Sequence, residues 1–189
     1  MTGWEQKRRH LRYYNRIASS YNMRYAEEQD LKIDAALKRL ELESHDSVLD
    51  LGCGTGILVS RMHNAVQVAV GLDVSKGMLK EIEGSVKDSS NVHFIIADVD
   101  HTPIRSEYFD MVFAITLLQN MPNSYVTLQE AKRVAKRDAP VIVTGLKKCF
   151  TKDSFQDLLK GAGLDARLLE IDENLKCHIA ICRKPKLRA

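Results

Sequence analysis

The sequence predicts an α/β protein: a three-layer sandwich on a mostly parallel, seven-stranded sheet with helices on both faces. From residue 44 onward, short runs rich in Val, Ile and Leu alternate with segments of helical periodicity, the pattern of a parallel sheet with helical connections. Near the carboxyl terminus, two strand-like runs, 166–172 and 177–183, are joined only by ENLK. Because so short a link forces antiparallel pairing, we expect the last strand to be antiparallel, in a C-terminal hairpin at one edge.

The individual elements follow from periodicity and from capping residues. Residues 4–40 predict helix, since from Asp30 the apolar residues recur with helical spacing. After a polar connection, the expected strands are 47–52, 66–73, 92–98, 109–118 and 139–146, and the expected helices are 55–64, 75–89, 124–136 and 151–163. Ser75 and Thr151 are suitable caps for two of these helices. The run 109–118 is apolar almost throughout, as expected of a strand buried on both faces.

The composition is that of one globular domain. Apolar residues make up 44% and charged residues 28% of 189 residues, which is an ordinary globular balance. No window approaches the 18 or so apolar residues of a membrane span, and the start of the chain lacks the apolar core of a secretory signal. The four cysteines form no C-x-x-C pair and have no histidines at metal spacing. We therefore expect reduced thiols, no metal, no membrane association and a cytoplasmic protein.

Positive charge is concentrated at the two ends of the chain. Residues 1–24 and 176–189 each carry +5, so the residues between them carry −7 of the total of +3. The arginines of the first segment recur with helical spacing: Arg8, Arg9, Arg12 and Arg16. These ends could form an electrostatic footprint for a polyanion, or they could be solvated tails. Charge alone leaves both interpretations open.

The stretch VLDLGCGTG places Gly52, Gly54 and Gly56 at alternate positions directly after a strand. A strand, a glycine-rich turn and a helix start together form a cradle for a nucleotide, at the sheet edge where open α/β proteins bind ligands. The dinucleotide fingerprint is absent, since Ile57 stands where its third glycine is required, and so is the G-K-[ST] of a P-loop. Asp50, two residues before the first glycine, would repel a pyrophosphate and suits a cationic group.

Two further acids come at the ends of the next two predicted strands. Asp73 follows the first glycine by about 20 residues, the place of an acid that holds ribose hydroxyls. Asp98 ends the third strand, where its carboxylate can accept a hydrogen bond from an exocyclic amine such as that of adenine. Together with the glycine loop, these acids describe an adenosine with a cationic tail.

Four motifs, taken in order, resemble those of the class I S-adenosylmethionine-dependent methyltransferases: VLDLGCGTG, GLDVS, ADVD and FDMVFAITLLQNMP. The segment YYNRIASSYN resembles the Y-x-x-I-A-x-x-Y segment of their small single-domain members, so that the resemblance covers residues 12–183. It implies S-adenosyl-L-methionine as cofactor and one methyltransferase domain over 1–189. That domain would consist of an N-terminal helical cap (1–43), a Rossmann-like core (44–183) and a basic tail (184–189).

The resemblance also implies a cofactor site. Its residues would be Tyr21, Asp50, Gly52, Cys53, Gly54, Gly56, Asp73, Val74, Asp98, Val99 and Leu117. Asp73 would hold both ribose hydroxyls, and Asp98 the adenine amine with the backbone of Val99 beside it. Tyr21 would either fold over the methionine end or pack in the core. Cys53 is expected only as a small residue, without a nucleophilic role.

The acceptor is less well defined by the sequence. Gln119 and Asn120 are the candidates for acceptor contact, and the L-H-H-x-x-D of many small-molecule relatives and the N-P-P-Y of amide and adenine N-methyltransferases are both absent. The short loops late in the sheet leave no room for lid helices, so only the first 40 residues could cover the site.

This open site with basic flanks favours a macromolecular acceptor, tRNA or rRNA ahead of protein, bound through the basic N- and C-terminal segments and helped by an activating subunit. Two alternatives stay open. One is a small-molecule methyltransferase whose N-terminal helices form a lid. The other is a non-catalytic module that binds S-adenosylmethionine.

Overall fold

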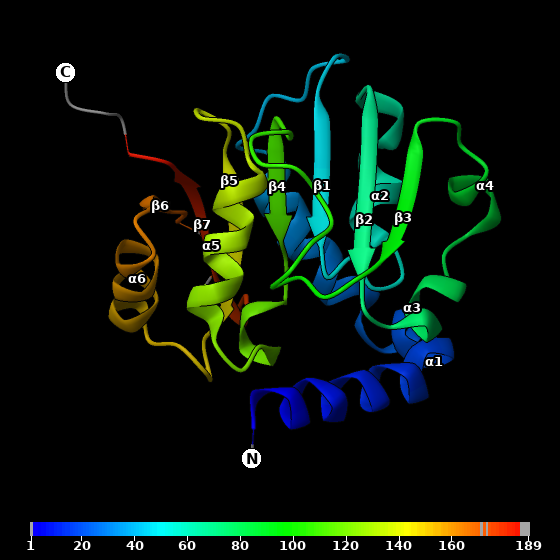
Figure 1. The fold of residues 1–189 in the computed structure, drawn as a ribbon, viewed down its shortest axis with the longest axis horizontal. Helices are drawn as coiled ribbons and strands as arrows, with labels where there is room; N and C mark the ends of the chain where they lie inside the picture. Colours follow the sequence, from blue (N-terminus) through cyan, green and yellow to red (C-terminus); the bar gives the residue numbers. More distant parts are fainter. Residues whose placement is uncertain (1, 171, 173, 186–189) are drawn as a thin grey trace.

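Seven strands form one mixed sheet at the centre of the molecule (Figure 1). The computed structural model describes residues 2–170, 172 and 174–185. The strands are β1 (Ser47–Leu51), β2 (Val68–Asp73), β3 (Val92–Ile96), β4 (Met111–Ala114), β5 (Val141–Leu146), β6 (Asp165–Leu168) and β7 (Cys177–Arg183). They lie in the order β3-β2-β1-β4-β5-β7-β6, and β7 runs in the direction opposite to the other six strands. The predicted fold class is confirmed.

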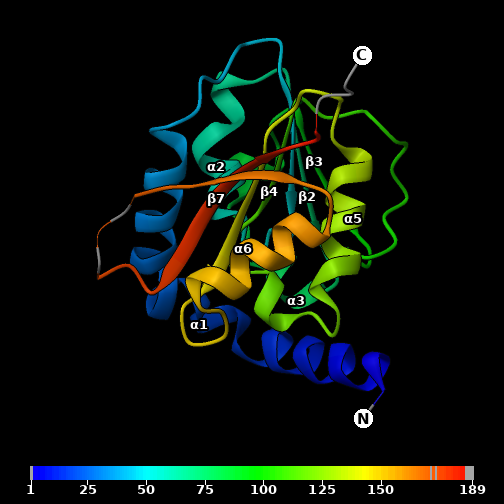
Figure 2. The same cartoon turned by 90° about the vertical axis from the view of Figure 1, so that its left-hand side faces the viewer.

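Helices cover both faces of this sheet, as Figure 2 shows. They are α1 (Gly3–Leu37), α2 (Ile57–Met62), α3 (Lys76–Lys80), α4 (Gly84–Lys87), α5 (Ser124–Val134) and α6 (Lys152–Gly161), with 3-10 turns η1 (His63–Ala65) and η2 (Leu118–Asn120). Successive strand residues point to opposite faces, so Val48 belongs to the core under α1 and α2, whereas Leu49 belongs to the core under α5 and α6. A strand whose side chains enter both cores therefore has an apolar residue at nearly every position of its sequence.

Helix α1 begins with a capping box in which Thr2 and Glu5 satisfy each other's backbone N–H groups. Its first turns lie across the carboxyl-end edge of the sheet, and its later turns pack on the face that α2 covers (Figure 2). Two carboxylates on these later turns, Asp30 and Asp34, bond Arg61 of α2. α1 is therefore tied to the body of the domain along its length.

Asparagines on α1 join the helix to the loops that surround the site. The Oδ1 of Asn15 accepts hydrogen bonds from the hydroxyl of Ser75 and the backbone N–H of Gly77, both at 2.8 Å. A Cβ on Gly77 would lie 2.7 Å from that oxygen, so glycine permits the close approach of α1 to α3. One helical heptad later, Asn22 accepts a hydrogen bond of 2.5 Å from the hydroxyl of Thr55, in the glycine loop.

The structure differs from the sequence prediction in two elements. The single helix expected at 75–89 is two helices, because Glu83 adopts an extended backbone with ψ of 140°. The strand expected at 109–118 is shorter, because the chain turns out of the sheet at Thr116, which has a φ of +59°. The C-terminal hairpin forms one edge of the sheet as predicted, and its second strand, β7, is the one that pairs with β5.

Candidate active site

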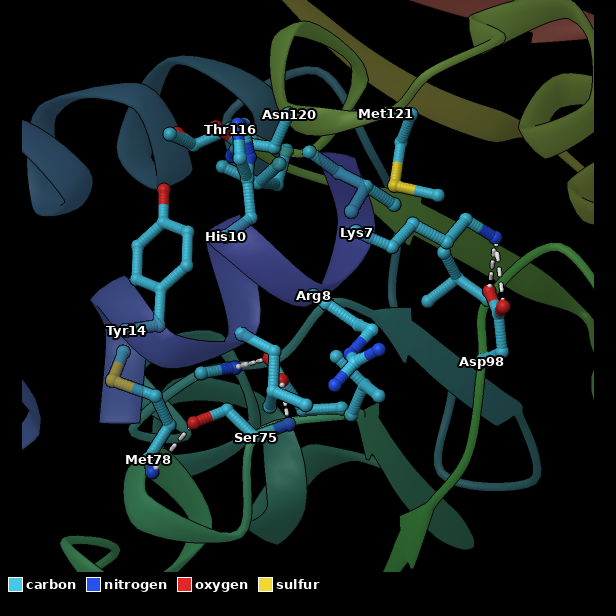
Figure 3. Close-up of a pocket in the computed structure, with 18 of the residues that line it drawn as sticks. Lys7, Arg8, His10, Tyr14, Ser75, Met78, Asp98, Thr116, Asn120 and Met121 are labelled. Carbon is cyan, nitrogen blue, oxygen red and sulfur yellow. Dashed lines mark hydrogen bonds and ion pairs between the residues drawn. The ribbon is translucent and has the colours of Figure 1, made fainter. Parts of the chain in front are cut away.

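A cavity of about 110 Å³ lies at the carboxyl ends of β1, β2, β3 and β4, beneath α1 (Figure 3). Because these strands are parallel, the loops that follow them meet at one edge of the sheet. These loops contribute Gly52, Gly54, Asp73, Val74, Ser75, Asp98, Val99, Ile115, Thr116, Leu117, Asn120 and Met121, and α3 contributes Met78. α1 contributes Trp4, Lys7, Arg8, His10, Leu11, Tyr14 and Tyr21. The cavity therefore has a floor from the sheet and a roof from one helix.

The glycine loop brings bare backbone to the cavity wall. Gly52 has a φ of +74°, which residues with a Cβ rarely adopt, and a Cβ there would lie 2.9 Å from Cδ1 of Leu117. Gly54 also has positive φ and lines the same cavity. Gly56 differs, since it caps α2 and faces Ile82 instead of lining the cavity. Two of the three glycines thus form the cradle, and the third shapes the helix start.

The carboxylate of Asp73 is held in a fixed orientation at the end of β2. One oxygen accepts from the N–H of Gly54 at 2.9 Å and the other from the N–H of Ser75 at 2.7 Å. Burial raises the pKa of Asp73, and these backbone hydrogen bonds oppose that rise. Each oxygen keeps a further lone pair, so the carboxylate can accept two adjacent hydroxyl groups such as those of a ribose.

Asp50 lies in a smaller cavity that adjoins the first through Gly52, Gly54 and Tyr21. It is only 3% exposed, and burial, with the nearby charge of Asp73, raises its pKa to about 8. Among the described residues, none donates a hydrogen bond to its side chain or pairs with it. A buried carboxyl without a partner favours a cationic ligand, since a cation would restore the charged form.

Cys53 lines this smaller cavity as well. Burial raises the pKa of its thiol well above the ordinary value, so the nucleophilic thiolate form is disfavoured. This agrees with its expected role as a small residue in the motif.

The end of β3 carries an ion-paired cluster (Figure 3). The ammonium of Lys7 lies 2.7 Å from both oxygens of Asp98 and 2.5 Å from Asp100. The first turns of α1 are thereby fastened over the cavity. An amine that approaches Asp98 must share the carboxylate with Lys7.

Thr116 is held in a strained backbone conformation by residues from several elements. Its φ of +59° is unusual for a β-branched residue. Its N–H donates to the hydroxyl of Thr144 at 2.7 Å, and its own hydroxyl donates to Gln29 at 2.8 Å. The same hydroxyl accepts at 3.1 Å from Lys32, a fully buried ammonium that also pairs with Glu28 at 2.7 Å. The loop after β4 is thus fixed from below by β5 and from above by α1.

The two amides predicted as acceptor contacts help to hold this loop. Gln119 and Asn120 both donate to the carbonyl of Thr116, at 2.6 and 2.9 Å. Asn120 also lines the cavity, as does Tyr14. Gln119 lines a groove just outside the cavity. Asn120 is therefore the better placed of the two candidates.

The two adjoining cavities bring together the residues predicted for cofactor binding, with Gly56 as the exception. The sequence prediction missed most of the roof. A signal was present, because Lys7, Tyr14 and Tyr21 are seven residues apart and Trp4 and Leu11 repeat the same interval. Such spacing places side chains on one face of a helix.

The donor chemistry of the cavity fits an adenosine with a cationic tail, given the acids at three strand ends and the glycine cradle. Within residues 2–170, 172 and 174–185, no cluster of three His, Cys, Asp or Glu side chains could hold a metal ion. No helix in the same residues is long and apolar enough to cross a bilayer.

The strand order, the antiparallel β7 and the acids around the glycine loop define the class: the Rossmann-like α/β fold of class I S-adenosylmethionine-dependent methyltransferases. The chain belongs to the methyltransferase domain family, whose model matches residues 49–143. S-adenosylmethionine is the cofactor that this family implies.

Comparisons with known proteins agree with this assignment. The malonyl-[acyl-carrier protein] O-methyltransferase of Marinomonas sp. (strain MWYL1) is 30% identical over 146 residues, 75% of this chain and 53% of that protein. The structure named DhpI-SAH complex has a TM-score of 0.80 at 22% identity, over 98% of this chain and 100% of that one.

A second structural match is a chain in the complex between the Haloferax volcanii Trm112 methyltransferase activator and a protein described as a methyltransferase. Its TM-score is 0.79, at 16% identity. That match covers 91% of this chain and 97% of the other. The two structural matches show a shared fold. The chain spans about half the length of the curated relatives it matches.

Proposed function

We propose that this protein transfers a methyl group from S-adenosylmethionine to RNA, with protein as the next acceptor class. The observation that carries the proposal is one edge of the sheet at which a glycine cradle, three acids and a basic helix come together. The cradle and the acids suit the cofactor, and the exposed arginines of α1 suit a polyanionic acceptor.

In this proposal the cofactor lies along the carboxyl ends of β1, β2 and β3. Asp73 holds the ribose hydroxyls, Asp98 meets the adenine amine beside Val99, and Asp50 faces the cationic methionine end. Tyr21, in the roof above Asp50, covers that end. When bound, S-adenosylmethionine supplies a methyl group on a positively charged sulfur, which is already a good leaving group.

The protein's main task is then to position the acceptor and exclude water. Leu117 and Ile115 are buried and present apolar surface to the cavity. Asn120 and Tyr14 both line the cavity and offer polar contacts to the acceptor. Burial raises the pKa of Tyr14, so its hydroxyl stays protonated and acts as a hydrogen-bond donor near neutral pH.

His10 is the residue of the lining best suited to accept a proton from the acceptor (Figure 3). Burial, and then the charge of Arg9, lower the pKa of its imidazole, so the ring is neutral near pH 7. Its Nδ1 is buried and has no hydrogen-bond partner within the described residues. A neutral imidazole with a free ring nitrogen is the usual form of a general base.

The basic residues near the carboxyl terminus do not lie together. Lys176 immediately precedes β7, next to the end of β5 and the site. Arg183 and Lys184 lie at the opposite edge, where Lys184 bonds Glu107 and the carbonyl of Ala135. Only Lys176 therefore supports an acceptor at the active site, and residues 186–189 lie outside the described part of the chain.

An activating subunit belongs to the proposal as well. The support is the shared fold with a chain that is in a complex with a methyltransferase activator.

A small-molecule acceptor is the second candidate, because the first turns of α1 close over the cavity through Lys7 and its two acidic partners. A roof of this kind encloses a small acceptor. Malonyl-[acyl-carrier protein] O-methyltransferase and demethylmenaquinone methyltransferase are among the related proteins.

Tritium transfer from methyl-labelled S-adenosylmethionine into a cell extract separates these acceptors. Counts that nuclease removes and protease leaves support the proposal. Counts that survive both treatments in the small-molecule fraction favour the lid alternative. If calorimetry showed no S-adenosylmethionine binding, both the macromolecular and the small-molecule methyltransferase would be excluded. Cofactor binding without any methyl transfer would favour a non-catalytic module.

A further inference from the structure

Two grooves flank the mouth of the cofactor cavity, and both carry exposed cations. The first, of about 510 Å³, is lined by Arg9, His10, Arg12, Tyr13, Tyr14, Arg16 and Asn120. The second, of about 760 Å³, has the tyrosines of α1 and the loop after β4 on one side and Lys147, Lys148 and Lys176 on the other. Tyr14 and Asn120 line both grooves and the cofactor cavity. These two residues therefore stand where all three spaces meet.

The arginine groove presents charge that the protein itself does not neutralise. Arg9, Arg12 and Arg16 are exposed and lie on one face of α1. Among the described residues, no carboxylate forms an ion pair with any of the three. Arg9 and Arg16 are separated by about 10 Å along the helix axis, given a rise of about 1.5 Å per residue. Free guanidinium groups in a row suit a chain of phosphates.

The lysine groove is basic overall even though it contains one acid. Glu28 lines it, but that carboxylate is already paired with buried Lys32 at 2.7 Å and with Lys176 at 3.2 Å. Lys147 and Lys148, in the loop after β5, are exposed. Cations thus border the cavity mouth from two different elements of the fold.

Aromatic rings lie between the two sets of cations. Tyr13 is 40% exposed and belongs to both grooves, and the guanidinium of Arg16 lies 5.9 Å from its ring centre. Tyr14 contacts Tyr13 edge-to-face, and Tyr21 and Tyr25 continue the row. Rings between phosphate-binding cations are the arrangement with which proteins bind single-stranded nucleic acid, because bases stack on rings.

We infer that these two grooves form one continuous track for single-stranded RNA across the mouth of the active site. Phosphates lie on Arg9, Arg12 and Arg16 at one end and on the lysine groove at the other. A base stacks on Tyr13 between them, and the target base enters the cavity past Tyr14 and Asn120. This inference rests on the proposed function and adds the path of the acceptor. An acidic protein would use the same cations without needing the rings.

The test is binding of a fluorescein-labelled 12-nucleotide RNA to the full chain saturated with S-adenosylhomocysteine, measured by anisotropy across salt concentrations. Arg12→Ala and Lys148→Ala should each weaken binding and reduce the salt slope by about 0.7, the value for one phosphate contact on a single strand. Tyr13→Ala should weaken binding by about 5- to 150-fold without changing the slope, because stacking is not ionic. Lys160→Ala on α6 and Tyr125→Ala on α5 remove exposed residues of the same types and should leave binding unchanged.

Calorimetry with S-adenosylhomocysteine on every variant separates the two levels of the inference. If the wild-type protein did not bind S-adenosylhomocysteine, the proposed function itself would be overturned. Intact cofactor binding without RNA binding would overturn the track alone, as would RNA binding insensitive to all three groove variants. If polyglutamate displaced the labelled RNA as well as unlabelled RNA does, and Tyr13→Ala had no effect on binding, the grooves would be assigned to an acidic protein. That result would also overturn the RNA track.

Discussion

Replacing Asp50 with Asn should stabilise the cofactor-free protein and at the same time weaken cofactor binding. The carboxyl is 3% exposed, has no partner among the described residues, and has a pKa that burial, together with Asp73, raises to about 8. An aspartate in the unfolded chain titrates near 3.9. The folded state therefore holds this proton more tightly, and the stability contributed by the neutral carboxyl is complete below about pH 4. It is lost as the pH rises toward 8.

The expected stability difference between wild type and Asp50→Asn follows from the folded and unfolded pKa values of Asp50. Between pH 4 and 8 the wild-type protein should lose about 1.4 kcal/mol per pH unit relative to Asp50→Asn, which amounts to about 4 kcal/mol at pH 7 as an order of magnitude. Urea unfolding of both proteins between pH 4 and 9 measures this difference. An asparagine variant that is less stable than wild type at pH 7 to 8 would refute the reasoning, because it would mean that the folded protein already stabilises the carboxylate.

Cofactor binding should respond in the opposite direction. If Asp50 faces the cationic methionine end, the affinity of the wild-type protein should rise up to tenfold per pH unit between pH 6 and 8, because binding must release the carboxyl proton. The α-amino group of the cofactor titrates in the same range, so the difference between wild type and Asp50→Asn isolates the carboxyl. Equal affinities and equal pH profiles for the two proteins in calorimetry would place the cation elsewhere.

Three further changes test other parts of the site. Gly52→Ala should cost about 1–2 kcal/mol of unfolding free energy for its left-handed backbone alone, and more if Leu117 cannot shift; an unchanged urea midpoint would contradict the strained turn. Lys7→Met should increase amide exchange in the first turns of α1 by about fivefold, which corresponds to an ion-pair contribution near 1 kcal/mol. Residues 28–37 of the same helix should stay protected. Unchanged exchange in the first turns would show that the ion pair with Asp98 does not hold the helix in place. Asp73→Ala should weaken S-adenosylhomocysteine binding by about 2–4 kcal/mol, as for the loss of a charged hydrogen-bond partner; unchanged affinity would mean that the ribose lies elsewhere.

Most of the sheet could be predicted because its signals are local. The runs at β1, β2 and β5 are apolar and short, and glycine-rich or polar turns separate them. The positions of Asp50, Asp73 and Asp98 could be predicted for the same reason, since a residue that ends a parallel strand must lie at the carboxyl edge. The turn at Thr116 was missed because it depends on tertiary partners, Thr144 and Gln29, and the break in the helix expected at 75–89 was missed as well.

The amino-acid sequence by itself determined the fold class, the glycine cradle and the order of the acids, since periodicity and strand ends define these features within a few residues of chain. Only the tertiary structure decided what covers the cradle and where the charges lie. It placed Lys7 on Asp98, 91 residues away. It also placed Lys176 beside the site and Lys184 at the opposite edge. These pairings depend on the docking of α1 and the insertion of β7, contacts between distant segments that no local pattern encodes.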